Sequence, residues 1–266
     1  MARSVVFILV CFMVVRARAA VIFNATVGYS GTVATRGVET LKLAGPKDLW
    51  PGLCRPGIRN PVFPDFLDLD AQARLGALAV SWSAQGLKWI CFDIEYLKPV
   101  EDPGACNRFL ITFARVVRKA APGLKVGFYG LPPIRDYWRV QKGFGSPAYQ
   151  AWRAENRALM PAGEAMDAIF PSLYTFYTDQ AGWIRYATAN IAEAKRYGKP
   201  VYPFLWPRYH DSNKRLAWQP LELDYWDKEL ATVFAQADGA VIWDWGKGKP
   251  WDESAPWWMD VKKYAH

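Results

Sequence analysis

The chain has 266 residues, of which 52% are hydrophobic and 22% are charged. A chain of this length and composition can bury a large core, and an α/β barrel of about 250 residues commonly forms a single domain, so we expect one domain. The formal net charge is +8, which suits a polyanionic partner and serves solubility equally well, because net charge governs association and not mechanism.

The first residues have the pattern of a secretory signal. Arg3 precedes an unbroken apolar run over residues 5–15, and Ala17-Arg18-Ala19 matches a small-x-small cleavage site. The apolar run is too short to cross roughly 30 Å of hydrocarbon as a helix. We therefore predict a signal peptide over residues 1–19 and a mature chain over residues 20–266 that is secreted or periplasmic, with no stable membrane insertion. Cleavage would remove three arginines and no acid, leaving a net charge of +5.

Short apolar segments alternate with amphipathic ones along the chain. Residues 21–29 are expected to supply a first strand, and a further short strand is expected within residues 40–43. Later strands are predicted over residues 87–92, 124–129, 168–174, 200–206 and 240–245. Helices are predicted over residues 68–85, 107–121, 146–160, 179–197, 221–236 and 257–264.

This alternation is typical of parallel βαβ units. The predicted fold is a TIM-like (β/α) barrel of seven or eight parallel strands, which need not be regular. A doubly wound open sheet is the rival, and it is disfavoured because no Gly-rich phosphate loop follows any strand.

Two carboxylates stand where one of these apolar strands ends. Asp93 and Glu95 lie two residues apart in the run at 92–96, FDIEY. Residues at this spacing in a strand point to the same side, with Cα atoms about 6 to 7 Å apart. In a barrel this end of the strand belongs to the face where active sites are built. An acidic loop that merely caps the next helix is the alternative interpretation of the pair.

Polar and aromatic side chains at the ends of the other strands would converge on this pair. These side chains are Tyr129, Ser172, Tyr174, Trp206, Trp243 and Trp245. The chain has 14 tryptophans, and flat rings with a polar edge suit the faces of pyranose sugars. Trp152 and Trp226 lie within helical patterns, so we assign both to core packing.

The close spacing of the two carboxylates constrains the chemistry. Glycoside hydrolysis normally uses an acid to protonate the leaving oxygen and a second group to attack or stabilise the anomeric carbon. Two carboxylates on one strand fit substrate assistance, in which a 2-acetamido group of the sugar is the nucleophile. Glu95 would then be the general acid, with its pKa raised by burial and by the neighbouring Asp93 charge, and Asp93 would hold the acetamido nitrogen.

Four segments resemble, in order, segments of the family 56 hyaluronidases. The run at 92–99, FDIEYLKP, resembles that family's Asp-x-Glu segment. The run at 127–132, GFYGLP, is similar to its Gly-Tyr-Tyr strand end, and the run at 168–174, AIFPSLY, to its Phe-Pro-Ser-x-Tyr strand. The run at 239–243, GAVIW, resembles its last Gly-x-Val-x-Trp strand.

The resemblance extends over about residues 87–245 and implies roles for particular residues. Glu95 would be the proton donor and Asp93 would position the acetamido group. Tyr129, Tyr174 and Trp243 would line the subsite for the N-acetylated sugar. The implied activity is that of a retaining endo-β-N-acetylhexosaminidase acting on hyaluronan or a related glycosaminoglycan.

Two other functions stay open. A lysozyme-like muramidase of the family 25 type also has an Asp-x-Glu strand end, and a basic exported protein would suit peptidoglycan; the Phe-Pro-Ser-x-Tyr stretch argues against it. A non-catalytic carbohydrate-binding barrel would keep the aromatic cleft, but it would need no proton donor.

No cofactor, metal or nucleic-acid partner is expected, and we expect a monomer. His210 and His266 are isolated, and no paired Cys/His spacing of a zinc site is present. Lys and Arg are scattered, without a nucleic-acid-binding motif. Cys11 lies in the signal, and among the remaining cysteines the favoured disulfide joins Cys54 to Cys106.

Overall fold

The computed structural model describes residues 20–30, 35–45, 48–49 and 68–265. The predicted signal peptide, with Cys11, lies outside these residues, as do Cys54 and His266. Among the helices of the described part, none is long and apolar enough to cross a bilayer.

Short strands form the centre of the molecule. Their bounds are β1 Val21–Asn24, β2 Val38–Thr40, β3 Lys42–Ala44, β4 Trp89–Phe92, β5 Lys125–Phe128, β6 Phe204–Leu205 and β7 Gly239–Ile242. Strands β4 and β7 are buried along their whole length, which explains why they are continuous apolar runs and do not alternate with polar residues.

The strands pair in parallel in the order expected of a (β/α) barrel. One sheet has the order β2-β1-β7-β6 and the other has the order β3-β4-β5. Isolated parallel bridges continue this order from β5 to residues 169–172 and on to residues 201–204: they join Tyr129 to Phe170, Ile169 to Val201, and Ser172 to Phe204. The fold class predicted from the alternation is confirmed.

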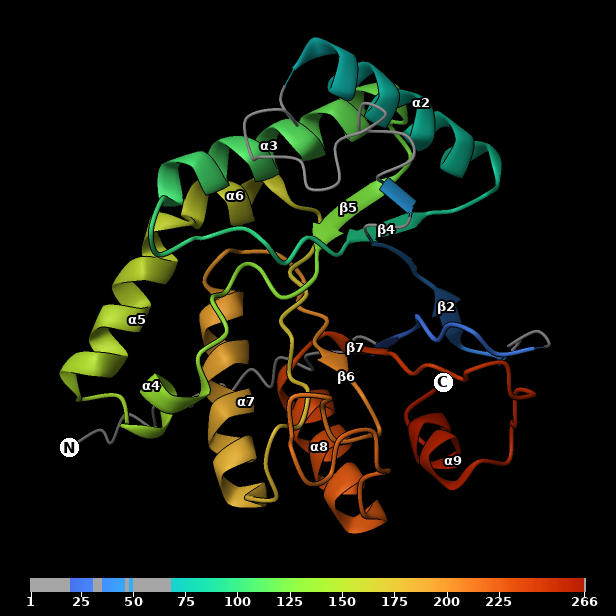
Figure 1. Ribbon diagram of the computed structural model, residues 1–266, viewed down its shortest axis with the longest axis vertical. Helices are drawn as coiled ribbons and strands as arrows, with labels where there is room; N and C mark the ends of the chain where they lie inside the picture. Colours follow the sequence, from blue (N-terminus) through green and yellow to red (C-terminus); the bar gives the residue numbers. More distant parts are fainter. Residues whose placement is uncertain (1–19, 31–34, 46–47, 50–67, 266) are drawn as a thin grey trace, which may run out of the picture.

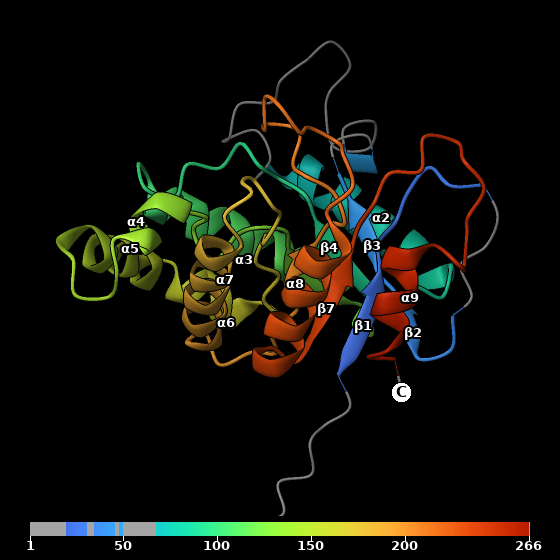
Figure 2. The ribbon, with the colours of Figure 1, turned by 90° about the horizontal axis from the view of Figure 1, so that it is seen from below.

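Helices cover the outside of the strands. Their bounds are α2 Leu69–Ala84, α3 Pro103–Ala120, α4 Tyr137–Gln141, α5 Pro147–Ala158, α6 Met160–Ala165, α7 Gln180–Lys195, α8 Leu223–Gln236 and α9 Pro256–Lys262. Helices α2 and α3 pack side by side near β4 and β5, and α7 and α8 pack side by side near β6 and β7 (Figure 1). In the perpendicular view, β1, β3, β4 and β7 lie between α7 and α8 on one side and α9 on the other (Figure 2).

The helix starts follow from the sequence. The Asp102 carboxylate accepts a hydrogen bond from the amide of Ala105 at 2.8 Å, and Pro103 occupies the first turn of α3. For this reason α3 begins at Pro103, four residues before the predicted start. Ser146 and Pro147 begin α5 in the same way. The predicted helix over residues 146–160 is divided into α5 and α6, and the short α4 was not predicted.

Aromatic side chains fill the space between the strands. Phe23 contacts Trp89, Phe170 and Tyr202, with ring centroids 5.1 to 6.5 Å apart. Gly127 faces this interior: a Cβ atom there would lie 2.3 Å from Cε2 of Phe170, so the close approach of the ring requires glycine. The same cluster extends to Tyr129, Tyr174 and Trp206 at the carboxyl ends of the strands. The side chains that fill the barrel are therefore packed directly beneath the residues at this end of the strands.

Candidate active site

A cavity of about 490 Å³ opens at the carboxyl ends of the strands. Its walls come from the segments that follow β1, β3, β4, β5, β6 and β7 and from residues 174 and 210–218. The lining residues are Val27, Leu43, Gly45, Asp48, Asp93, Glu95, Tyr129, Tyr174, Trp206, His210, Asp211, Trp218 and Trp243. This is the face of a (β/α) barrel on which ligands bind.

Asp93 follows directly after β4 and is partly buried in this cavity. Its amide donates a 3.0 Å hydrogen bond to the carbonyl of Ala44, which continues the pairing of β3 with β4 by one residue. Burial raises the pKa of the Asp93 carboxyl from 3.8 to about 6, and the nearby charge of Glu95 adds to this shift. Asp93 is therefore ionised at neutral pH and takes up a proton in mildly acidic solution.

Glu95 lines the same cavity, as the two-residue spacing predicts, but it lies in a turn beyond the strand. Its side chain is 60% exposed, so the predicted burial of Glu95 is wrong: the strand ends at Phe92, and the turn carries Glu95 toward solvent. Nη2 of the Arg135 guanidinium lies 4.0 Å from Oε2 of Glu95.

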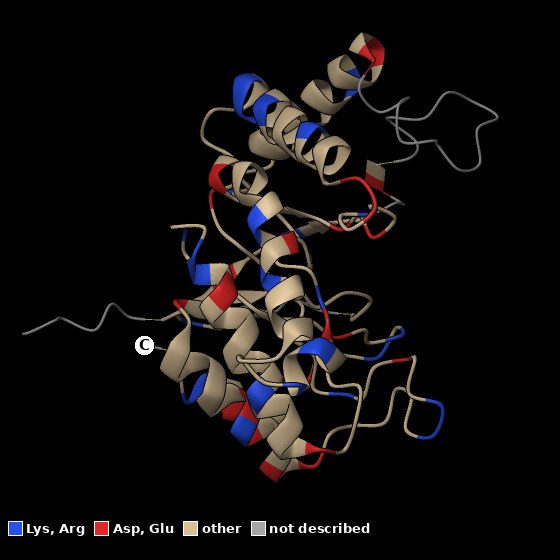
Figure 3. Cartoon of the chain, turned by 90° about the vertical axis from the view of Figure 1, so that its left-hand side faces the viewer, with Lys and Arg blue, Asp and Glu red and all other residues tan. Residues whose placement is uncertain are grey.

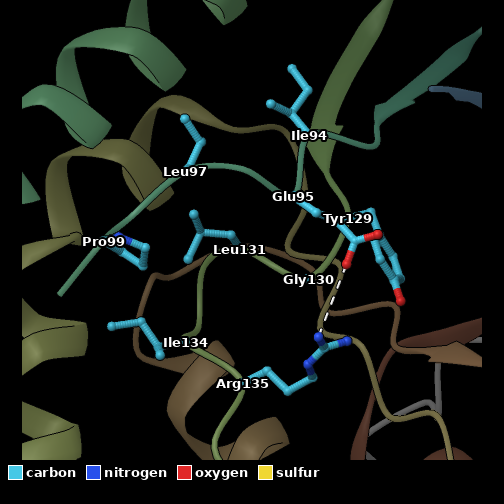
Figure 4. A pocket seen from close by; sticks show the side chains of 9 residues that line it. All are labelled: Ile94, Glu95, Leu97, Pro99, Tyr129, Gly130, Leu131, Ile134 and Arg135. Carbon is cyan, nitrogen blue, oxygen red and sulfur yellow. Dashed lines mark ion pairs between the residues drawn. The ribbon is translucent and has the colours of Figure 1, made fainter. Parts of the chain in front are cut away.

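Glu95 also borders a second, smaller cavity of about 160 Å³. This cavity is lined by Ile94, Glu95, Leu97, Pro99, Tyr129, Gly130, Leu131, Ile134 and Arg135. Figure 4 shows Arg135 extending toward the Glu95 carboxylate on the side where Gly130 lies. Glu95 and Tyr129 are shared by the two cavities, so the predicted acid stands at the boundary between them.

Four aromatic rings form the wall of the larger cavity. The centroid of Tyr174 lies 5.6 Å from that of Tyr129, 5.8 Å from that of Trp243 and 5.5 Å from that of Trp206. The rings of Trp206 and Trp243 are 4.7 Å apart. The structure thus brings four of the predicted aromatic residues together around Asp93, with apolar faces and hydroxyl groups suited to a sugar ring.

The two other predicted site residues do not line this cavity. Ser172 is buried, and its hydroxyl lies 2.9 Å from the hydroxyl of Tyr129. Ser172 thus positions Tyr129. Trp245 is 43% exposed and packs at the rim against Trp218, with centroids 5.6 Å apart.

The Trp206 side of the cavity rests on a buried carboxylate, Asp244. Nε1 of Trp206 donates to Asp244 at 2.9 Å, Nε of Arg208 donates at 2.7 Å, and the hydroxyl of Tyr29 donates as well. Burial raises the pKa of Asp244, but the hydrogen bonds from Arg208 and Tyr29 outweigh this effect, so the pKa is lowered. Asp244 therefore stays ionised and holds Trp206 in place.

The Asp244→Asn variant is expected to lower the free energy of unfolding by about 2 kcal/mol, because it removes the charge that pairs with Arg208 and a buried acceptor. Urea unfolding at neutral pH measures the change. Asp227→Asn is the control, since that side chain is 56% exposed and the variant should change stability by less than about 0.5 kcal/mol. Equal losses in both variants would contradict a structural role for Asp244.

His210 and Arg135 are site residues that the sequence did not reveal. Nδ1 of His210 lies 2.8 Å from the hydroxyl of Ser212 and 3.1 Å from Oδ1 of Asp211. Burial lowers the pKa of His210; the charge of Asp211 opposes this shift and that of Arg135 adds to it. His210 is therefore a neutral hydrogen-bonding group in the cavity wall. Neither residue belongs to a local motif, so only the folded chain reveals them.

Within the described part of the chain, no cluster of three or more His, Cys, Asp or Glu side chains could hold a metal ion. The thiols of Cys91 and Cys106 are both free and buried. Cys54, the favoured disulfide partner of Cys106, lies outside the described residues, and the free thiol of Cys106 does not agree with that pairing. Basic and acidic residues are interspersed along the helices in the view of Figure 3.

Fold and site together define a (β/α) barrel with an acidic, aromatic cavity at the carboxyl ends of its strands, and known structures share this fold. Bee venom hyaluronidase has a TM-score of 0.62 and 14% identity, over 92% of this chain and 96% of that one. An endo-β-1,4-mannanase from Thermotoga petrophila has a TM-score of 0.56 and 14% identity, over 86% of this chain and 58% of that one. The spore cortex-lytic enzyme SleL of Bacillus megaterium has a TM-score of 0.51 and 13% identity, over 86% of this chain and 60% of that one. No protein-family model and no curated protein matches the sequence.

Proposed function

We propose that the protein is an exported glycoside hydrolase that cleaves a polysaccharide containing N-acetylhexosamine, such as hyaluronan or a related glycosaminoglycan. The observation that carries this proposal is that Asp93 and Glu95 share one cavity with the rings of Tyr129, Tyr174, Trp206 and Trp243. Residues 20–266 would form one catalytic domain, released by removal of residues 1–19. The fold, shared with bee venom hyaluronidase, accords with this function.

The site supports a retaining, substrate-assisted reaction. The carbonyl oxygen of the 2-acetamido group attacks the anomeric carbon while the carboxylic acid of Glu95 gives its proton to the leaving oxygen. Asp93 accepts a hydrogen bond from the acetamido N–H and balances the positive charge that develops on the resulting ring. Water then attacks the anomeric carbon, Glu95 takes a proton from that water, and the product keeps the configuration of the substrate.

A reducing-end assay on hyaluronan, chondroitin, N-acetylglucosamine oligomers and peptidoglycan tests this function. We expect new reducing ends from at least one of the first three polymers. Cleavage of peptidoglycan alone would favour a muramidase. Sugar binding in a calorimetric titration, without any new reducing ends, would identify a non-catalytic binding barrel.

A thiazoline mimic of the cyclised acetamido group tests the mechanism. The mimic should inhibit competitively, because it has the shape and charge of the intermediate that the site is proposed to stabilise. A muramidase in which water attacks directly should be largely unaffected, so cleavage that continues in the presence of the mimic would contradict substrate assistance.

A further inference from the structure

Two aromatic side chains are exposed outside the cavity and in contact with each other. Trp138 is 62% exposed and Tyr177 is 39% exposed, and their ring centroids lie 5.2 Å apart. Contiguous exposed apolar surface marks binding sites, whereas single exposed apolar side chains are ordinary.

Both rings are held on rigid supports. Trp138 belongs to α4, which is fixed to α5 by the two hydrogen bonds of Arg139 to Glu155, each 2.7 Å. Gln141 ties α4 to α7 through a 2.7 Å hydrogen bond to the carbonyl of Gly182. The carbonyl of Tyr177 accepts a hydrogen bond from the hydroxyl of Tyr225 at 3.2 Å. The rings are thus preorganised, which lowers the entropic cost of binding a ligand.

The exposed pair is continuous with the cavity. Phe176 packs against His210 in the cavity wall, with centroids 4.5 Å apart, and against Tyr177, with centroids 6.3 Å apart. The guanidinium of Arg135 lies 5.4 Å from the centroid of Phe176 and 4.0 Å from Glu95. Contacts through Arg135 and Phe176 therefore link Glu95 to the exposed ring of Tyr177.

The position of Glu95 indicates which part of a bound sugar chain would lie over the exposed rings of Trp138 and Tyr177. Glu95 separates the aromatic cavity that contains Asp93 from the smaller cavity that contains Arg135. If the N-acetylated sugar occupies the aromatic cavity, the oxygen that Glu95 protonates lies at this boundary. The sugars beyond that oxygen would then extend over Arg135 toward Trp138 and Tyr177.

We propose that Arg135, Trp138 and Tyr177 form a binding surface for the sugars on the leaving-group side of the bond that is cleaved, so that the enzyme acts within long chains. This inference rests on the proposed function, and it adds the direction in which the substrate lies. The apolar faces of the rings would stack on sugar rings, and Arg135 would bind a carboxylate or hydroxyl group of the first leaving sugar.

Calorimetric titration of Trp138→Ala, in a Glu95→Gln background that prevents cleavage, tests the surface. The probes are a long oligosaccharide and a disaccharide, taken both from hyaluronan and from N-acetylglucosamine oligomers. We expect Trp138→Ala to weaken the binding of the long probe about tenfold and to leave the disaccharide unchanged, since only a long chain reaches the ring.

Phe144→Ala is the matched control, because Phe144 is also exposed, at 64%, and lies outside both cavities. The inference is overturned if Trp138→Ala resembles this control, or if it weakens the long and short probes equally. Cleavage by the otherwise unaltered chain separates the two proposals. If the chain cleaves the polymer but Trp138→Ala has no effect on binding, the proposed function stands and the proposed binding surface is wrong. If the chain neither binds nor cleaves any probe, both the proposed function and the proposed binding surface are wrong.

Discussion

The Glu95→Gln variant is expected to lower the kcat for an N-acetylhexosamine polysaccharide at least about a hundredfold. Glutamine has nearly the shape of glutamate but cannot give a proton to the leaving oxygen, and general acid catalysis contributes typically 10² to 10⁴ in rate. Steady-state kinetics in the reducing-end assay measure the loss. Glu95 is 60% exposed, and its ion pair with Arg135 is long, at 4.0 Å. Such an exposed pair contributes little to stability, so the substitution should leave the melting temperature nearly unchanged.

Glu101→Gln serves as the control for this experiment. Its side chain is 68% exposed and pairs with Lys98 outside both cavities, so its kcat should match that of the original chain. If Glu95→Gln retains near-normal turnover, Glu95 is not the general acid.

The Asp93→Asn variant is expected to lose activity and gain stability. The pKa of Asp93 is raised to about 6 in the folded chain, above the value near 3.9 of an unfolded chain. The ionised carboxylate therefore costs stability, and this cost is absent below pH 4 and fully present above pH 6. Replacing it with a neutral amide should stabilise the fold at pH 8 by up to about 3 kcal/mol, and should make little difference at pH 4.

Urea unfolding of the original chain and of the Asp93→Asn variant at pH 4 and pH 8 measures this difference in stability. Glu164→Gln, which changes an exposed carboxyl group on α6, should change stability little at either pH. A destabilised Asp93→Asn protein at pH 8 would show that the carboxylate is part of the structural framework.

The same pKa predicts the pH dependence of catalysis. Asp93 must be ionised to accept the acetamido N–H bond and to balance the developing charge, so kcat/KM should fall about tenfold per pH unit below pH 6. The Asp93→Asn variant should be about a hundredfold less active at neutral pH, and its kcat/KM should not show the fall below pH 6, the acidic limb of the pH profile. An unchanged limb in the variant would assign it to another group.

Much of the fold was predictable because buried parallel strands are continuous apolar runs and helices have caps. The runs at 89–92 and 239–242 were recognisable in this way, and each lies within or next to its predicted strand. The strand predicted over residues 168–174 is present only as isolated bridges. Its pairing depends on neighbours that are distant in sequence, so the local pattern could not reveal its irregularity.

The site was predictable only where its residues follow strands. Asp93, Tyr129, Tyr174 and Trp243 could be found from their strands, and they line one cavity. The exposure of Glu95 depends on where β4 stops, because one turn carries the side chain away from the buried face. Arg135 follows a pair of prolines and belongs to no periodic pattern, so only tertiary packing brings it to the edge of the smaller cavity.

Proton NMR of the first product released from a β-linked N-acetylhexosamine polymer tests the proposed reaction and its stereochemistry together. We expect that a new reducing end appears first as the β anomer and then equilibrates with the α anomer, since two displacements at the anomeric carbon retain the configuration. The early appearance of the α anomer would contradict substrate assistance, and the absence of any new anomeric signal from all the polymers would contradict the proposed function.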